Sequence, residues 1–253
     1  MRITFLGTGT SQGIPVITCG CEVCRSDDPR DNRLRVSILI ETEDKTIVID
    51  SGPDFRYQML RAKVKDLDAI VYTHEHKDHV AGLDDIRPFN YMLRKNIDIY
   101  ATTQVQQALK REFSYIFAEK VYPGTPKINV HTIGHENFNI GNTEFIPLDI
   151  MHYKLPILGY RMGDFTYLTD VKTVPQSTIN KIRGTKVLVV NALQREEHIS
   201  HFTLAEALAF AAEIGAGTTY FTHISHNLGR HADVEKELPS NIRLAYDGLS
   251  IEI

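Results

Sequence analysis

Short apolar runs and longer amphipathic stretches alternate along the chain, with turn residues between them. Apolar runs of about four to eight residues bounded by Gly, Pro or Asp are typical of buried strands, and longer runs with a helical period are typical of helices. The pattern predicts strands at residues 3–6, 36–41, 46–50, 67–73, 97–101, 143–150, 159–162, 166–169, 187–191 and 219–221. It predicts helices at residues 54–64, 79–93, 104–117, 176–182 and 203–214.

The order of strands followed by helices recurs in both halves of the chain. Segment 122–141 is rich in Pro, Gly and Asn, and such a composition is also typical of a domain linker. We predict no boundary there, because candidate metal ligands described below stand on both sides and must converge in space. Two sheets packed on each other with helices outside account for the repeated order. The sequence therefore predicts an α/β (α+β) protein, a four-layer αββα sandwich, with residues 1–253 as a single domain.

Composition and charge exclude several classes of protein. Hydrophobic residues make up 42% and charged residues 24% of the 253, close to the average for a soluble globular protein. The net charge of -4 supplies no positive field for nucleic-acid phosphates, so a small substrate is favoured over long RNA. The first apolar run is too short for a signal peptide, and no run approaches the roughly 18 apolar residues of a membrane span. We expect a cytoplasmic protein without a membrane partner.

The strongest chemical signal is the segment His74-Glu75-His76-Lys77-Asp78-His79, directly after a predicted buried strand. It places four side chains of metal-ligand type within six residues, on a loop where they can turn inward together. Imidazole and carboxylate ligands suit Zn, Fe or Mn. A polar surface turn is the alternative, but so many histidines after a buried strand make it the weaker interpretation.

With this HxHxDH motif the sequence resembles the metallo-β-lactamase superfamily, along essentially the whole chain. In that family a distant His, a bridging Asp and a last His complete the motif, each after a strand, and His152, Asp170 and His223 stand at these positions in the required order. The resemblance implies one metal at His74, His76 and His152, a second metal at Asp78, His79 and His223, and Asp170 as a bridge between them.

The resemblance also implies how such a site works. Two divalent metals about 3.5–4 Å apart can share a hydroxide, because metal binding lowers the pKa of water to about 7. The nucleophile then forms without a strong base, and Asp78 counts as both ligand and catalytic residue. Asp50, in Ile-Asp-Ser-Gly, resembles the family's carboxylate that orients a ligand histidine. A turn cap before Gly52 is an equally good interpretation of Asp50.

Three cysteines, Cys19, Cys21 and Cys24, form a second constellation, CxCxxC. An odd number cannot close completely into internal disulfides, and in a reducing compartment such a cluster is more typical of metal ligands. A tetrahedral zinc needs a fourth ligand, which His226, three residues after His223, can provide. We therefore predict one structural Zn. A redox-active thiol pair and reduced loop cysteines are the alternatives.

The combination of CxCxxC with the downstream HxxH resembles one branch of the superfamily, the phosphoribosyl cyclic phosphodiesterases of the PhnP type. Glycine-rich turns at residues 7–10, 52–56 and 82–87 add to that resemblance. It implies hydrolysis of a small phosphodiester, such as a cyclic ribose phosphate. In such relatives a His at the position of His201 contacts a phosphate oxygen or the leaving group, and a shift in alignment would give this role to His198.

The remaining charged residues are weaker candidates. Arg87, slightly beyond the histidine motif, is a better candidate for contacting an anionic substrate than the arginines between positions 25 and 35. Four arginines between positions 25 and 35 are interleaved with aspartates, which favours a solvated loop over a phosphate clamp. We expect His131, His135 and His231 to be ordinary surface or loop histidines.

Other functions stay open at this point. A tRNA 3′-end nuclease of the same superfamily shares HxHxDH and the opening Phe-Leu-Gly-Thr-Gly, but the acidic charge and the lack of an obvious basic arm count against it. Lactam or thioester hydrolysis is less favoured by the branch features. A non-enzymatic, zinc-stabilised binding domain is disfavoured because every expected ligand position is filled. Nucleic acid is thus a disfavoured partner, and a homodimer is an open alternative for assembly.

Overall fold

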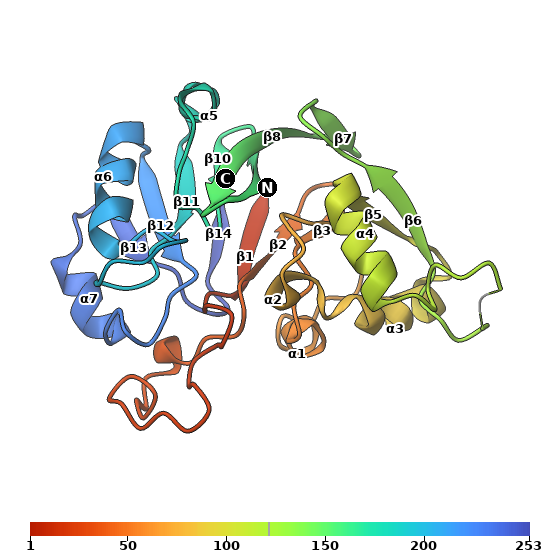
Figure 1. Cartoon of the computed structure of the whole chain (residues 1–253), viewed down its shortest axis with the longest axis horizontal. Helices are drawn as coiled ribbons and strands as arrows, with labels where there is room; N and C mark the ends of the chain where they lie inside the picture. Colours follow the sequence, from red (N-terminus) through yellow and green to blue (C-terminus); the bar gives the residue numbers. More distant parts are fainter. Residues whose placement is uncertain (121) are drawn as a thin grey trace.

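Two seven-stranded sheets form the centre of the computed structural model, which describes residues 1–120 and 122–253 (Figure 1). The first sheet contains, in spatial order, β14 (Ser250–Glu252), β1 (Arg2–Gly7), β2 (Ser37–Glu41), β3 (Thr46–Ile49), β4 (Ala69–Val71), β5 (Ile97–Ala101) and β6 (Ile128–Thr132). The second contains β13 (Ile242–Leu244), β12 (Thr218–Thr222), β11 (Val187–Asn191), β10 (Phe165–Tyr167), β9 (Leu155–Met162), β8 (Thr143–His152) and β7 (Phe138–Ile140).

Helices cover the outer face of each sheet. They are α1 (Phe55–Arg61), α2 (Lys77–Val80), α3 (Arg87–Leu93), α4 (Thr103–Glu112), α5 (Gln176–Ile182), α6 (Leu204–Ile214) and α7 (His231–Glu237), with 3-10 turns η1 (Pro29–Asp31) and η2 (Leu83–Ile86). In Figure 1, α1, α3 and α4 lie beside the first sheet at the right, and α6 and α7 lie beside the second sheet at the left. No described helix combines the length and apolarity needed to cross a bilayer.

Alternation of side chains along the strands creates three apolar layers. Ile38 of β2 and Tyr160 of β9 belong to the cluster between the two sheets. Leu39, the residue after Ile38 in β2, belongs with Phe55 of α1 to the cluster under the helices of the first sheet. Leu188 of β11 belongs to the cluster under the helices of the second sheet. Three such layers define four layers of secondary structure, so the predicted αββα sandwich is confirmed.

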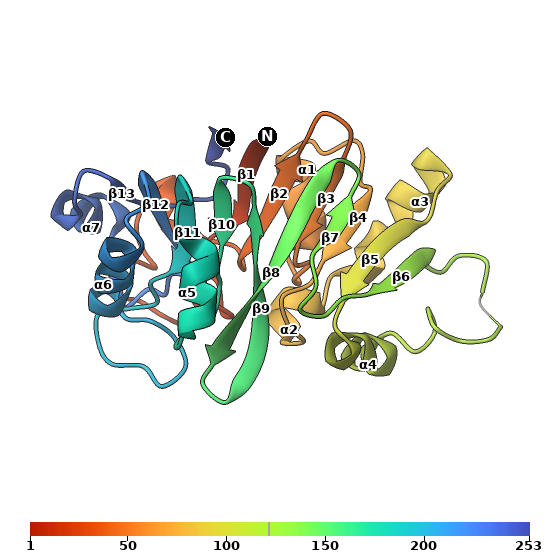
Figure 2. The same ribbon diagram turned by 90° about the horizontal axis from the view of Figure 1, so that it is seen from above.

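Parallel strands at the centre of each sheet determine where loops gather. Strands β3, β4, β5 and β6 are mutually parallel, and so are β10, β11, β12 and β13. Loops after the carboxyl ends of parallel strands meet at one edge, which is where open α/β sheets bind their ligands. Figure 2 shows α2 and α4 along one edge of the molecule, with both chain termini at the opposite edge.

The predicted helix 79–93 is wrong as a single element, because the chain forms α2, η2 and α3 there. The backbone N–H of Gly82 donates to the carbonyl oxygen of Ser51 at 2.8 Å instead of to a carbonyl of the preceding helical turn, so the helix does not continue through Gly82. Pro88 then stands in the first turn of α3, a position that tolerates its missing N–H. The predicted capping box at α6 is confirmed, with Thr203 and Glu206 bonded reciprocally.

Segment 122–141 is not a plain loop, since it contains β6 and β7. Strand β6 forms the edge of the first sheet, and four of its five residues are exposed, so it lacks the apolar signal of a buried strand. The sequence pattern also missed α7, β13 and β14, which are short or peripheral. Every predicted strand overlaps an observed one.

Candidate metal centres

The predicted active-site ligands all follow strand ends, and the fold brings them to one edge. His74, His76, Asp78 and His79 lie between the end of β4 and α2, while His152 is the last residue of β8. Asp170 and His223 follow β10 and β12 at the carboxyl ends of parallel strands of the second sheet. The edge thus collects side chains from both sheets, although His74 and His223 are 149 positions apart in the chain.

Two carboxylates and two imidazoles form the densest part of this cluster. One ligand atom each from Asp78, His79, Asp170 and His223 lies within 4.8 Å of every other. His223 Nε2 is 3.0 Å from Asp170 Oδ1, and His79 Nε2 is 3.3 Å from Asp170 Oδ2 and 3.4 Å from Asp78 Oδ2. Asp170 therefore lies between the two histidines, the place that a bridging ligand occupies.

Three further imidazoles adjoin this group. The ring centroid of His76 is 4.6 Å from that of His74 and 5.1 Å from that of His152, and the His74 and His152 centroids are 5.8 Å apart. The His74 ring is also 4.1 Å from the His79 ring, which links the trio to the carboxylate-containing group. The sequence-predicted ligands thus form one continuous cluster.

Asp50 holds two of these histidines in place through hydrogen bonds. Its Oδ2 accepts a hydrogen bond from His79 Nδ1 at 2.7 Å and another from Thr73 Oγ1 at 2.7 Å. Because the Thr73 hydroxyl donates to Asp50, it can accept from His74 Nδ1 at 3.0 Å. Asp50 is fully buried, so these bonds are shielded from water. Thr73, a link that our sequence analysis missed, stands directly before the histidine motif.

The hydrogen bonds of His152 fix which ring nitrogen is free. Its Nδ1 lies 2.9 Å from the carbonyl oxygen of Asp170 and 3.0 Å from that of Ser200. Carbonyl oxygens only accept, so Nδ1 carries the proton and Nε2 keeps its lone pair. A histidine that ligates a metal uses its other N–H in this way.

Backbone strain marks the same residues. Asp50, Asp170 and His223 have φ angles of 63°, 58° and 52°, in the left-handed region that is costly for residues other than glycine. Each follows a strand of the central parallel set. Strain of this kind persists only where the surrounding structure holds it, and it concentrates at functional sites. It turns these side chains toward the shared edge.

The carboxylates favour positive charge on two of the histidines, His79 and His223. Burial alone would lower the pKa of His223, but the carboxylates of Asp170 and Asp78 outweigh burial and raise this pKa to about 9. Likewise, burial would lower the pKa of His79, and Asp170, Asp50 and Asp78 raise it well above its ordinary value. Burial lowers the pKa of His74, helped by the nearby His79. The carboxylates thus favour a cation beside His79 and His223, the charge that a divalent metal would supply.

Buried ring nitrogens provide the test of whether a metal fits. Within the described part of the chain, His74 Nε2, His79 Nε2 and both nitrogens of His223 are buried and lack a hydrogen-bond partner. Leaving buried polar atoms unpaired is costly. Carboxylate oxygens lie 3.0–3.4 Å from two of these nitrogens without hydrogen-bond geometry, as expected for ligands that point at a common centre. The residues fit divalent metals.

His201 packs against the histidine cluster, next to His152 and His223. Its ring centroid is 4.6 Å from that of His152 and 4.7 Å from that of His223, and its Nδ1 is 3.8 Å from Asp170 Oδ1. His198 lies outside it, with its ring 5.1 Å from that of His201 and its Nδ1 bonded to Ser200. Of the two candidate histidines, His201 is therefore the one in contact with the candidate ligands.

Arg87 does not join the cluster. It pairs with Asp84 and lines a hollow of about 640 Å³, together with Tyr91 and Tyr115, that none of the candidate metal ligands lines. A role in binding substrate at the metals is thus not supported for Arg87.

Two predictions were wrong: that the arginines between positions 25 and 35 lie in a solvated loop, and that His231 is a surface or loop histidine. Arg33 is fully buried rather than solvated, and it donates to Thr8 Oγ1 and to the carbonyl oxygen of Ala245. His231 is also buried, with Nδ1 3.0 Å from Arg33 Nη2. The pair fastens the N-terminal loop to α7. His131 and His135 are exposed, as predicted.

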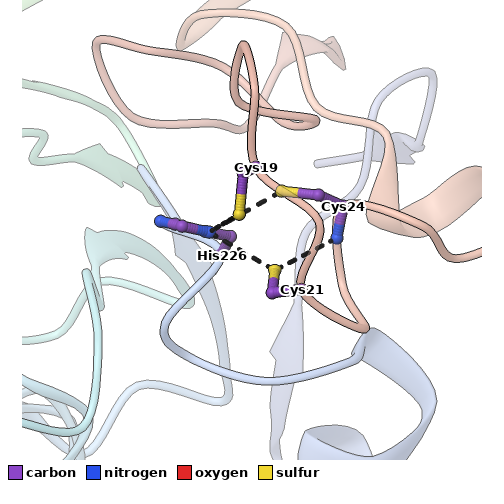
Figure 3. Close-up of side chains that lie close together, drawn as sticks. All are labelled: Cys19, Cys21, Cys24 and His226. Carbon is purple, nitrogen blue, oxygen red and sulfur yellow. Dashed lines mark hydrogen bonds between the residues drawn. The ribbon is translucent and has the colours of Figure 1, made fainter.

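The second candidate centre contains the three cysteines and His226 (Figure 3). Nδ1 of His226 lies 3.3, 3.4 and 3.6 Å from the sulfur atoms of Cys19, Cys21 and Cys24. A tetrahedral zinc with bonds of about 2.3 Å would separate its ligand atoms by about 3.7 Å, close to these distances. The backbone N–H of Cys24 lowers the pKa of Cys21 to about 6, which favours the thiolate that zinc requires.

This second centre lies beside the first because one segment contributes to both. His223 and His226 are three residues apart, and Ile224 between them pairs with Gly9 and Thr8 of the N-terminal loop. In Figure 1 this loop projects below the body of the molecule, next to the C-terminal part of the second sheet. A zinc bound there would fasten the loop to the strand end that carries His223.

Replacing Cys21 with Ser should remove about one metal ion per chain and leave the metals of the histidine cluster in place. Serine is a much weaker zinc ligand than thiolate, and three ligands do not close a structural site. Elemental analysis after dialysis gives the metal content, and Ser26→Ala, a change in the same loop outside the centre, is the control. An unchanged zinc content in Cys21→Ser would contradict the four-ligand site.

Comparisons with known proteins agree with this fold. A family model described as a beta-lactamase superfamily domain matches residues 45–224. A solved structure described as a new diphosphatase from the PhnP family is 41% identical, with a TM-score of 0.94. The match covers 100% of this chain and 98% of that chain.

Curated relatives are longer proteins. An octanoyltransferase of Porphyromonas gingivalis is 40% identical over 252 residues, which are 98% of this chain and 51% of that protein. A ribonuclease Z of Nostoc is 27% identical over 169 residues, which are 65% of this chain and 47% of that protein. The chain thus spans about half the length of the curated relatives it matches.

Proposed function

The chain belongs to the metallo-β-lactamase superfamily and resembles the hydrolases of its PhnP branch, and from this premise we propose that it is a metal-dependent phosphodiesterase acting on a small diester. The observation that best supports the proposal is the largely buried cluster of Asp78, His79, Asp170 and His223, whose ligand atoms lie within 4.8 Å of one another. Residues 1–253 would act as one hydrolase domain.

Each candidate residue has an assigned role in this proposal. One metal, Zn, Mn or Fe, would be held by His74, His76 and His152, a second by Asp78, His79 and His223, and Asp170 would contact both. When bound, the two metals would polarise a phosphoryl oxygen and lower the pKa of water to about 7, which makes a nucleophile available near neutral pH. A structural zinc would be held by Cys19, Cys21, Cys24 and His226.

Side chains around the metals would hold the diester and receive its leaving group. His201 Nδ1 lies 3.8 Å from Asp170 Oδ1, and its ring stacks beside that of His223. From there the ring would donate a hydrogen bond to the leaving oxygen of a phosphate held at the metals. Asp50 would keep His79 and, through Thr73, His74 in the orientation that leaves their Nε2 lone pairs free. The products would be a phosphomonoester and an alcohol.

A substrate panel on the metal-reconstituted protein tests this proposal. We expect small linear or cyclic phosphodiesters to be hydrolysed, and thioesters and lactams to be poor substrates. The thioester arm is included because part of an octanoyltransferase is similar to this chain. Purified protein with bound metal that hydrolyses no diester but cleaves a thioester would overturn the assignment. Protein that binds metal but hydrolyses no substrate of the panel would instead favour a non-enzymatic domain.

The second candidate function is tRNA 3′-end cleavage, which the similarity to ribonuclease Z favours. Both reactions break a phosphodiester at two metals, so the ligand cluster alone does not separate them. The net charge of -4 opposes binding of a polyanion. A pre-tRNA cleaved with kcat/KM comparable to that of small diesters would make this the preferred function.

A further inference from the structure

The N-terminal loop, residues 8–36 between β1 and β2, lies along the chain that follows β12. We call residues 223–226 the His223 segment, because they contain a candidate ligand of each metal centre, one at either end. The contacts of the loop with the chain after β12 are, in order, Gly9 with Ile224, the three cysteines with His226, and Arg33 with His231. The loop therefore holds this part of the chain at three successive places.

Ile224 is fixed by backbone hydrogen bonds on both of its sides. Its N–H donates to the carbonyl oxygen of Thr8 at 2.9 Å, and its carbonyl oxygen accepts from the N–H of Thr10 at 3.0 Å. Ile224 is buried, so water does not compete for these two bonds. His223 is thus joined directly to a residue whose position is determined by the N-terminal loop.

The backbone of His223 needs such support. Its φ angle of 52° lies in the left-handed region, which is costly for a residue with a side chain. A return of φ to the common negative range would turn the imidazole away from Asp170, whose Oδ1 lies 3.0 Å from His223 Nε2. The place of this imidazole therefore depends on what holds its two neighbours, Thr222 at the end of β12 and Ile224.

The cysteine centre holds the His223 segment at its other end. Nδ1 of His226 lies 3.3–3.6 Å from the three sulfur atoms (Figure 3). Within the segment, the N–H of Ser225 donates to the carbonyl oxygen of Leu193 at 2.9 Å, and the N–H of Leu193 donates to the carbonyl oxygen of Phe202 at 2.9 Å. Phe202 directly follows His201. Zinc at the cysteine centre would therefore fix a segment that supports two histidines of the cluster.

Loss of zinc would release only one of the anchors of the N-terminal loop. Thiol groups are weak hydrogen-bond donors and acceptors, so without zinc the cysteines hold His226 weakly. Arg33, in contrast, is fully buried and donates to Thr8 Oγ1 at 2.8 Å, and its Nη2 lies 2.8–3.0 Å-range contact distance from His231 Nδ1, at 3.0 Å. Thr8 and Ile224 thus stay connected, and we expect a graded effect on His223 rather than its complete release.

We propose that the two metal centres are coupled through the His223 segment, so that zinc at the cysteine centre strengthens binding of the second metal by about tenfold, within the usual range of such couplings. The proposal rests on the proposed function for the assignment of that metal to Asp78, His79 and His223, and it gives the cysteine centre a regulatory role. Because coupling is reciprocal, the second metal should strengthen zinc binding by the same factor. The metal at His74 and its partners should respond little, because those residues follow other strand ends.

A titration with Mn²⁺ tests the coupling, because Mn²⁺ prefers nitrogen and oxygen ligands whereas thiolates select zinc. Protein that carries one zinc at the cysteine centre is titrated, and electron paramagnetic resonance measures the free Mn²⁺. In Cys21→Ser, one of two Mn²⁺ ions should bind about tenfold more weakly and the other should be unchanged. A tenfold change does not empty a tight site on dialysis, so it shows only at equilibrium.

Ile17→Ala is the matched control for Cys21→Ser. Ile17 belongs to the same loop, and its side chain is 88% exposed. Both Mn²⁺ affinities should stay unchanged in this variant. Removal and return of zinc in the unmodified protein should weaken and restore Mn²⁺ binding reversibly, which a misfolded variant would not do. Equal Mn²⁺ affinities with and without zinc would overturn the proposal.

Double variants test whether the effect passes through His223. In His223→Ala the remaining Mn²⁺ should bind equally well with and without Cys21→Ser, because the coupled ligand is already lost. In His76→Ala, which impairs the other metal, the tenfold effect of Cys21→Ser should persist. An undiminished effect in His223→Ala would show that the cysteine centre acts on the whole fold, and it would contradict the proposal.

Binding measured without hydrolysis separates this proposal from the function on which it rests. If the substrate panel shows no hydrolysis but Mn²⁺ binding depends on zinc as described, the phosphodiesterase assignment fails and the coupling stands. If diesters are hydrolysed but Mn²⁺ binds equally well with and without zinc, the coupling fails alone.

Discussion

Replacing His76 with Ala should lower kcat/KM for a generic phosphodiester by about a thousandfold or more. His76 is exposed at the start of α2, and its ring faces those of His74 and His152 at 4.6 and 5.1 Å. Its loss would remove one of three nitrogen ligands, and with it several kcal/mol of transition-state stabilisation that a bound metal supplies. Because the side chain is exposed, its removal leaves the core intact. Steady-state kinetics, metal content per chain and circular dichroism measure the three effects.

His131→Ala is the matched control for this experiment. His131 is an exposed histidine of β6, near Asp98 and outside the cluster. It should retain full activity and full metal content. If His76→Ala instead kept near-normal activity with two metals bound, the assignment of the catalytic metal site would be wrong.

The ligand set could be predicted from sequence because the family pattern names the ligand types and strand ends show where to look for them. A parallel strand places its next residues at one edge of the sheet, so a ligand-type residue after each buried apolar run has a defined place in space. His74, Asp170 and His223 each follow such a run, and the three lie in one cluster. The buried strands were found for the same reason, since continuous apolar runs are a strong signal.

Features that depend on tertiary contacts could not be predicted in this way. Strand β6 is polar and exposed, and only its pairing with β5 makes it a strand. The buried state of Arg33 depends on partners 198 and 212 residues away, His231 and Ala245. The contact between Thr8 and Ile224 is of the same kind. None of these contacts leaves a periodic pattern in the local sequence.

Replacing Asp50 with Asn should weaken metal binding by about 10–100-fold, the usual effect of losing a carboxylate that orients a metal ligand. Asn has nearly the same shape but only one acceptor oxygen, whereas Asp50 accepts from the backbone N–H of Thr73 at Oδ1 and from His79 Nδ1 and Thr73 Oγ1 at Oδ2. With the Asn oxygen kept on the Thr73 N–H, its NH2 group faces His79 Nδ1. His79 would then place its proton on Nε2, the nitrogen that faces Asp170 and Asp78. In this orientation the His79 tautomer that pairs with Asn cannot ligate, and in the flipped orientation the buried N–H of Thr73 loses its acceptor.

Competition with a chelator measures this loss, and Asp68→Asn is the matched control. Asp68 precedes β4 at the end opposite to the histidine motif, where it accepts from the backbone N–H of Thr46 at 2.8 Å and from Lys95 at 2.8 Å. Asp68→Asn should lower thermal stability through those lost contacts without changing metal affinity, because no cluster residue depends on them. Asp50→Asn should lower affinity more than any loss of stability accounts for. Equal metal affinities in the two variants would show that Asp50 only supports the fold.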